Sequence, residues 1–328
     1  MITQDTLYYT YLDECKRNYL TETLKKHTEE KIEEYSITSV TFESKYYKST
    51  FEHEWMKLCK KYQIDGDTAM HFVNYKKLIN TNKTEELVEK NYFLDANNQF
   101  SITLLKNFFQ DLKKLLDSTD FFITHTDFYW KPQQFLINRK QLEKIDLKKT
   151  SRQIAPKILN NIPYIAMKKH LDSLMINLLK QDTGEGTFLD TELPNKINTK
   201  LRFDADGKQF DAREDLKQAY NHTVTTGSDT VKSETVVKIL DEIRFIRKDE
   251  VGYKKNPNHC GLEVVDLLCS MISAENRLKE YKKTLNLQEH SELSEGKFIN
   301  LHFEDGDIIK FDSLLNKVKS KSITYHAY

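Results

Sequence analysis

The sequence predicts an α/β or mixed α+β fold, in which helices pack on the faces of a sheet. Two observations favour it: β-prone runs alternate with amphipathic helical stripes, and no internal repeat or convincing linker interrupts them. The 328 residues suffice for one sizeable core with insertions. We therefore expect a main domain over 1–281, with an insertion around 64–100, and a C-terminal hairpin and tail over 282–328.

The predicted elements follow from hydrophobic periodicity. A tyrosine-rich strand over 7–12 is expected to be central in the sheet, because aromatic residues fit a pleated, buried surface. Further strands are predicted over 36–42, 120–130 and 187–193, and helices over 51–62, 102–116, 165–179, 211–224 and 261–281. The segment 236–246 fits either a strand or a helix. The run FINLHFEDGDIIKF predicts a hairpin about an Asp-Gly turn.

Composition argues against several classes of protein. Fifty basic and fifty acidic residues give a formal net charge of zero, so no global field attracts nucleic acid. The basic segment 139–152 could follow a phosphate backbone or form a solvated loop. No membrane-spanning apolar stretch or secretory signal occurs, so we expect a cytoplasmic protein without membrane contact. The four cysteines lack paired spacing, which argues against a zinc site and a disulfide framework.

Two acids follow the first predicted strand. Asp13 and Glu14 come directly after the run YYTYL, where the strand is expected to end. Strand side chains alternate, so Asp13 would continue the face of Tyr9 and Tyr11, and Glu14 the opposite face. A strand that simply runs out into a polar turn gives the same pattern.

Further acids lie on other predicted elements. Asp266 is inside the last helix among apolar neighbours, so its carboxylate borders a packed surface and needs a cationic or metal partner. The polar margin of an amphipathic helix is the alternative interpretation. The predicted strand TFLDTEL places Asp190 and Glu192 on one face. Carboxylates from such segments could converge to bind Mg²⁺ or Mn²⁺, and two metals can activate water for phosphodiester cleavage.

Six motifs in order resemble the domain of unknown function 3800 family: YLDE, TDFYWK, YIAMKKHLDSL, TFLDTEL, REDLKQAY and GLEVVDLL. The resemblance covers 6–277. That family is grouped with ribonuclease H-like folds, whose active sites are carboxylate clusters that bind divalent metal. The resemblance implies a ribonuclease H-like mixed sheet with helices on both faces, to which the C-terminal hairpin would be a small appendage. Relatives often occur in bacterial mobile-element or antiphage neighbourhoods.

The resemblance assigns the family's acids to four positions of this chain: Asp13, Glu14, Glu192 and Asp266. All but Glu14 would be metal ligands. His71 falls near a histidine segment of the family, and Lys131 near a lysine that follows a central strand. Independently, His125 and Asp127 share one strand face. They could join a metal site, act as base and orienter, or form a hydrogen-bonded strand edge.

Two functions are therefore expected as alternatives. The first is a phosphodiester hydrolase of nuclease type that uses Mg²⁺ or Mn²⁺ and acts on nucleic acid, with a role in bacterial defence or mobile-element biology implied by the resemblance. The second is a noncatalytic interaction subunit whose protein partner does the chemistry in a multicomponent system. Zero net charge favours the second, as do the altered flanks of the motifs, Cys15 after the acids and Glu263 before the helix aspartate.

Overall fold

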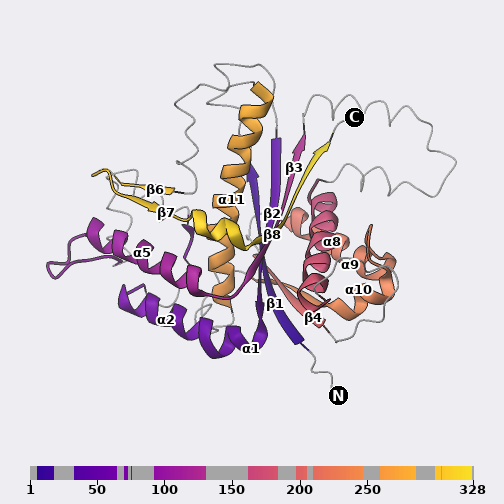
Figure 1. Ribbon diagram of the computed structural model, residues 1–328, viewed down its shortest axis with the longest axis horizontal. Helices are drawn as coiled ribbons and strands as arrows, with labels where there is room; N and C mark the ends of the chain where they lie inside the picture. The colour runs from indigo at the N-terminus through magenta and orange to yellow at the C-terminus, as the bar shows by residue number, and fades with distance from the viewer. Residues whose placement is uncertain are drawn as a thin grey trace.

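The computed structural model describes most of the sheet and the helices that pack on it. The described residues are 6–17, 33–64, 70–72, 75, 92–130, 162–183, 197–204, 210–246, 259–285, 300–303 and 305–326. Within them lie a six-stranded mixed sheet, a two-stranded sheet and seven α-helices (Figure 1). The prediction of a mixed α/β fold is confirmed.

The main sheet has the strand order β5-β4-β1-β2-β3-β8. Its strands are β1 (Thr6–Arg17), β2 (Glu33–Glu43), β3 (Phe122–Trp130), β4 (Ile197–Asp204), β5 (Leu240–Ile246) and β8 (Val318–His326). The first three strands pair antiparallel, β4 is parallel to β1, β5 is parallel to β4, and β8 is parallel to β3. The first predicted strand is therefore central, as expected from its aromatic composition.

The strand β1 continues beyond its predicted end. Asp13 and Glu14 lie opposite Thr38 and Ile37 of β2, and the ladder continues to Arg17. The prediction that the strand stops before the two acids was wrong. Ladder hydrogen bonds join backbone groups, so charged side chains do not end a strand whose partner continues beside it.

Helices cover both faces of the sheet (Figure 1). One face, which we call the α11 face, packs against α1 (Ser44–Tyr46), η2 (Tyr47–Phe51), α2 (Glu52–Lys61), α5 (Ile102–Ser118) and α11 (Cys260–Leu285). The other, the α8 face, packs against α8 (Ile162–Thr183), α9 (Phe210–Thr226) and α10 (Ser233–Ile239). Each face buries its own apolar cluster, because successive strand residues point to opposite sides.

The start of α11 packs directly on β1. A Cβ atom at Gly261 would overlap the ring of Tyr11. The Tyr47 hydroxyl accepts a hydrogen bond from the Gly261 N–H at 3.1 Å and lies 3.0 Å from the Cys260 sulfur. The absence of a side chain at Gly261 therefore sets how closely the helix approaches the central strand.

Two strands were missed in the sequence, and one ambiguity is resolved. The segment of β4 alternates apolar with polar or charged residues, the segment of β8 is mostly polar, and neither has a continuous apolar run. The segment 236–246 forms the end of helix α10 followed by strand β5, so both interpretations of it were partly correct. The predicted strand over 187–193 lies outside the described residues.

The C-terminal hairpin is present. Its strands are β6 (Asn300–His302) and β7 (Ile308–Lys310), and Gly306 in the turn has a φ of +89°, which favours glycine. Lys106 of α5 forms ion pairs with Asp305 and Asp307, which anchor the turn to that helix. The short helix η7 (Asp312–Lys317) then leads into β8 of the main sheet.

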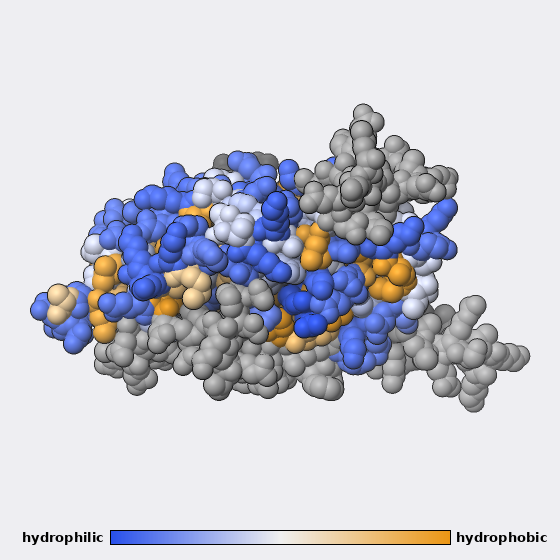
Figure 2. Space-filling view, turned by 90° about the horizontal axis from the view of Figure 1, so that it is seen from below, coloured by the Kyte–Doolittle hydropathy of each residue, from blue (hydrophilic) through white to orange (hydrophobic). Residues whose placement is uncertain are grey.

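The described surface seen from below is mainly hydrophilic, with smaller hydrophobic patches between the polar regions (Figure 2). None of the helices in the described ranges is both long and apolar enough to cross a membrane.

Candidate functional site

Two aspartates lie beside each other on neighbouring strands at the centre of the sheet. Asp13 follows Leu12 on β1, Asp204 follows Phe203 on β4, and Leu12 and Phe203 are register partners. Both apolar residues are buried on the α8 face, so alternation directs both carboxylates to the α11 face. Asp13 is only 8% exposed, and Asp204 is half-buried. The parallel pair thus presents two carboxylates where β4 ends, at the carboxyl edge where α/β sheets commonly bind ligands.

Asp204 is the residue that sequence reasoning missed. Its segment is not among the predicted strands, because Lys200 and Arg202 make the run before Asp204 look polar. The signal was a period of two: Leu201 and Phe203 are buried, and the charged residues alternate with them. A half-covered strand carries this pattern.

Asp266 lies on the helix that covers the same face. The sulfur of Cys269, one turn further along α11, is 3.7 Å from the backbone oxygen of Asp13. Asp266 Oδ2 accepts a hydrogen bond from the backbone N–H of Phe72 at 2.9 Å. The carboxylate therefore borders a packed surface, as its neighbours predict, and a peptide group is one of its partners.

Glu263, one turn earlier on α11, binds the segment that contains Phe72. Its two carboxylate oxygens accept hydrogen bonds from the Trp55 indole at 2.9 Å and from the Met70 backbone N–H at 2.6 Å. Together with Asp266 it fastens residues 70–72 to the helix. His71 lies between the two bonded residues and is exposed.

Glu14 lies on the opposite side of the sheet from Asp13. It accepts a hydrogen bond from the hydroxyl of Tyr35, whose ring belongs to the apolar cluster of the α8 face. Burial, reinforced by the negative charge of Glu14, raises the pKa of Tyr35 well above its usual value. The sheet therefore separates the two neighbouring acids. The remaining candidates, Asp190, Glu192 and Lys131, lie outside the described residues.

His125 and Asp127 form a buried network on the α11 face. His125 Nδ1 lies 2.8 Å from the Thr38 hydroxyl, and its Nε2 lies 2.7 Å from Asp127 Oδ1. The side-chain amide of Asn276 in α11 donates to Asp127 Oδ2. Burial raises the pKa of Asp127, but His125, Ser36 and Asn276 together outweigh it, so the pKa is lowered. Both carboxylate oxygens thus have protein partners.

The network is inside the sheet and continues toward Asp13. β3 has neighbours on both sides, so the interpretation of the His125–Asp127 pair as a strand edge was wrong. Thr38 lies opposite Asp13 on one side and opposite His125 on the other. One row across three strands therefore joins the buried network to the acid pair.

The predicted Mg²⁺ or Mn²⁺ site can be compared with the possible ligands in the described residues. No three His, Cys, Asp or Glu side chains in the described ranges form a group that could hold a metal ion. The carboxylates of Asp13 and Asp204 have the hard oxygen chemistry that suits Mg²⁺ or Mn²⁺. Asp266 would complete such a set from the helix, with one of its oxygens already accepting from Phe72. The residues therefore fit a divalent cation in their oxygen chemistry, and two of them directly follow register partners on neighbouring strands.

No protein-family model, curated protein or solved structure matches this chain.

Proposed function

We propose that this protein is a divalent-metal-dependent phosphodiester hydrolase of nuclease type, built on a ribonuclease H-like sheet. The observation that carries the proposal is that Asp13 and Asp204 directly follow the register partners Leu12 and Phe203 on adjacent parallel strands, on the face that the helix bearing Asp266 covers. The mixed sheet with helices on both faces supports the fold that the family resemblance implies.

Electrostatics favours a cation at the acid pair. Like charges on directly neighbouring strand positions destabilise a sheet, and burial raises the cost of each ionised carboxylate. Asp13 is buried, and its Oδ1 accepts a hydrogen bond from the Glu14 N–H at 2.8 Å, which orients the carboxylate. A hard cation shared by Asp13 and Asp204 would offset their repulsion.

Each residue then has a defined task. Asp13 and Asp204 would hold the metal, and Asp266, oriented by the Phe72 N–H, would complete the set from above. Glu192 remains a further ligand candidate from the resemblance. A bound divalent cation supplies activation of water and stabilisation of the leaving oxygen, and no covalent intermediate with the protein is needed.

The test compares identical substitutions at different aspartates. Asp13→Asn and Asp204→Asn should each reduce Mn²⁺-dependent cleavage of labelled single-stranded DNA or RNA by at least about 100-fold, because each removes a charged metal ligand. Asp312→Asn, an exposed aspartate in η7, is the matched control and should cleave like wild type. Glu192→Gln, assayed beside them, decides whether the acid of the TFLDTEL segment also contributes.

Calorimetric titration with Mn²⁺ supplies a measurement that does not depend on cleavage. The wild-type protein should bind the ion, and Asp13→Asn should bind it at least about tenfold more weakly. Cleavage that survives both Asp13→Asn and Asp204→Asn would show the assignment to be wrong.

The second candidate is a noncatalytic interaction subunit, which would act with a protein partner. It is favoured by the use of Glu263 and Asp266 to fasten residues 70–72 to α11, a structural task that both acids could serve without a metal. A protein that binds no Mn²⁺ at millimolar concentration would support this candidate. A role in bacterial defence remains a prediction from the resemblance.

A further inference from the structure

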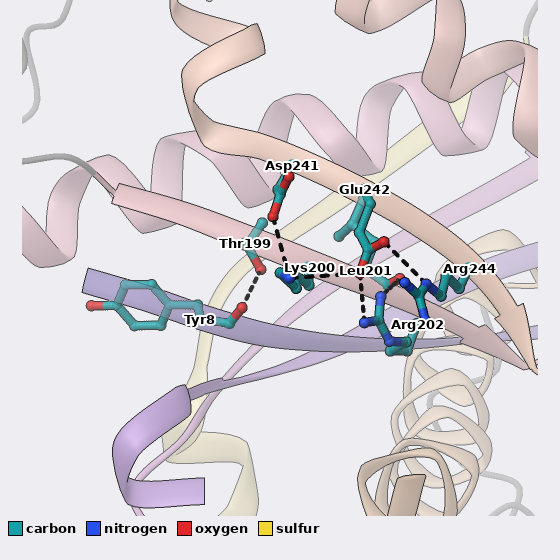
Figure 3. A network of polar contacts seen from close by, with 8 residues as sticks. All are labelled: Tyr8, Thr199, Lys200, Leu201, Arg202, Asp241, Glu242 and Arg244. Carbon is teal, nitrogen blue, oxygen red and sulfur yellow. Dashed lines mark hydrogen bonds and ion pairs between the residues drawn. The ribbon is translucent and has the colours of Figure 1, made fainter. Parts of the chain in front are cut away.

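A row of charged side chains lies on the α11 face of β4 and β5, next to the acid pair. Lys200 and Arg202 come from β4, and Glu242 and Arg244 from β5 (Figure 3). In the register of these parallel strands, Lys200 lies opposite Glu242 and Arg202 opposite Arg244. Lys200, Arg202 and Asp204 occupy alternate positions of one strand, so all three project to the same face.

A register shift brings the second arginine into this row. Thr199 pairs with Leu240, but the next residue, Lys200, pairs with Glu242, so Asp241 is an extra residue in the edge strand. Without this irregularity, Ile243 would lie opposite Arg202. Bulges of this kind change the direction of side chains and occur often beside functional sites.

This register places the positive charges of Arg202 and Arg244 opposite each other, so a negative charge nearby is needed to offset their repulsion. Arginines directly opposite each other destabilise a strand pair. Glu242 lies between them, with Oε1 accepting from Arg202 Nη2 at 2.7 Å and Oε2 accepting from Arg244 Nε at 3.0 Å (Figure 3). Burial raises the pKa of Glu242, but the two arginines outweigh it and lower the pKa overall. Glu242 therefore holds two guanidinium groups beside each other.

The cations keep hydrogen-bond donors that the described protein does not use. The Arg244 side chain is 64% exposed and forms its hydrogen bond through Nε. Lys200 Nζ is 3.7 Å from Asp241 and 3.9 Å from Glu242, which makes ion pairs without a short hydrogen bond. In the described part of the chain, the terminal nitrogens of Arg244 and the ammonium of Lys200 can therefore donate to an added acceptor.

The row ends at the acid pair. Arg202 precedes Asp204 by two strand residues, about 7 Å along β4. Helices α9 and α10 pack against the other face of this part of the sheet. A ligand on the exposed side of the row would therefore lie beside Asp13 and Asp204.

We propose that Lys200 and Arg244 form a phosphate-binding track that holds the backbone of a single nucleic acid strand beside Asp13 and Asp204. Arg202 lies between them with a side chain only 11% exposed, donates to the Leu201 oxygen and to Glu242, and adds its positive charge to the track. Only the purpose of the track, which is to hold a substrate for cleavage, rests on the proposed function. Guanidinium groups bind phosphate through two parallel hydrogen bonds, and a lysine adds a point charge. Such groups on two neighbouring β-strands suit the repeated negative charge of a polynucleotide backbone.

Binding is measured without divalent metal, so that cleavage plays no part. Fluorescein-labelled single-stranded 20-mers of DNA and of RNA are titrated with protein in EDTA, and anisotropy is followed at several salt concentrations. Arg244→Gln should weaken binding about tenfold at low salt, as expected for the loss of a charge-assisted contact. The slope of log K against log salt should fall by about 0.7 for each phosphate contact removed.

Matched variants separate charge from geometry. Arg244→Lys should keep the salt slope but bind less tightly, because it keeps the charge and loses the planar fork. The double variant Lys200→Gln/Arg244→Gln should bind more weakly than either single variant. Lys238→Gln removes the same charge from an exposed position on α10 and should bind like wild type. Melting followed by circular dichroism verifies that each variant is folded.

The outcomes distinguish this inference from the proposed function. If wild type binds neither 20-mer, or if the double variant binds like Lys238→Gln, the track is ruled out even where cleavage is observed. If binding depends on Arg244 but no metal-dependent cleavage occurs, the track stands and the hydrolase proposal fails. The DNA and RNA titrations show which strand chemistry the track prefers.

Discussion

Asp13 and Asp127 are both buried aspartates on the α11 face of the sheet, but their surroundings differ. Asp127 has His125 and Asn276 as partners for its two oxygens, and its pKa is lowered despite burial. Asp13 has a second carboxylate, Asp204, at the neighbouring position of β4. Asp127 is held by a strand neighbour and by the covering helix, which stabilises the packing of helix on sheet, whereas the negative charge that follows on the strand beside Asp13 favours a cation there.

The largest expected effect is a difference in the free energy of unfolding between Asp→Asn substitutions at these two positions. Asp127→Asn should lower the free energy of unfolding by about 3 kcal/mol, because the new amide would point a donor at His125 or Asn276 and leave a buried group without a partner. Asp13→Asn should change it by less than about 1 kcal/mol, since the substitution removes repulsion from Asp204. Urea denaturation at pH 7 measures both. Equal losses would mean that both aspartates are packing elements.

Gly261→Ala is expected to have the next largest effect. Its Cβ would overlap the Tyr11 ring, so α11 must shift away from β1, at a cost of about 2 kcal/mol. The shift also moves Asp266 relative to Asp13, so metal-dependent cleavage should fall more than stability alone explains. Ser270→Ala on the same helix is the control. Full activity in folded Gly261→Ala would show that the position of α11 does not matter to the site.

The α8 face carries a buried polar group whose effect depends on pH. His170 lies 2.9 Å from the Ser39 hydroxyl and 3.1 Å from that of Thr126, and burial, with a contribution from His125, lowers its pKa to about 3. The unfolded chain binds the proton near pH 6.5, so stability is complete above that pH and falls as pH drops toward 3. The slope should reach about 1.4 kcal/mol per pH unit.

His170→Gln tests this expectation by chemical denaturation between pH 7 and pH 5. The variant should be less stable than wild type at pH 7, but it should lose less stability on acidification. Parallel stability curves for the two proteins would contradict the assignment to His170.

The smallest expected effect concerns the charged row on β4 and β5. Glu242→Gln should lower the free energy of unfolding by about 0.5–1 kcal/mol, because Arg202 and Arg244 then repel each other at a partly exposed site where screening is strong. High salt should reduce the difference from wild type. A difference that does not change with salt would argue against this electrostatic role of Glu242.

Local periodicity predicted the helices and the central strand, but it failed where strand faces were charged. The stripes of α5 and α8 are regular enough to identify from sequence, and both helices are confirmed. The strand β4 was missed because Lys200, Arg202 and Asp204 occupy one of its faces. Asp204 was therefore not predicted as a site residue, although it lies at the centre of the candidate site.

The sequence by itself determined the helices with regular apolar stripes, such as α5 and α8, the central position of the first strand, and that Asp266 borders a packed surface, because these properties depend on residues close together in the chain. Only the tertiary structure decided that Asp204 lies beside Asp13, that Asp127 has partners for both oxygens, and that Arg244 lies opposite Arg202. Strand register pairs segments that are far apart in sequence. A register shift of one residue would move every side chain of the strand to the opposite face of the sheet. Local pattern cannot specify such pairings, because they depend on two segments at once.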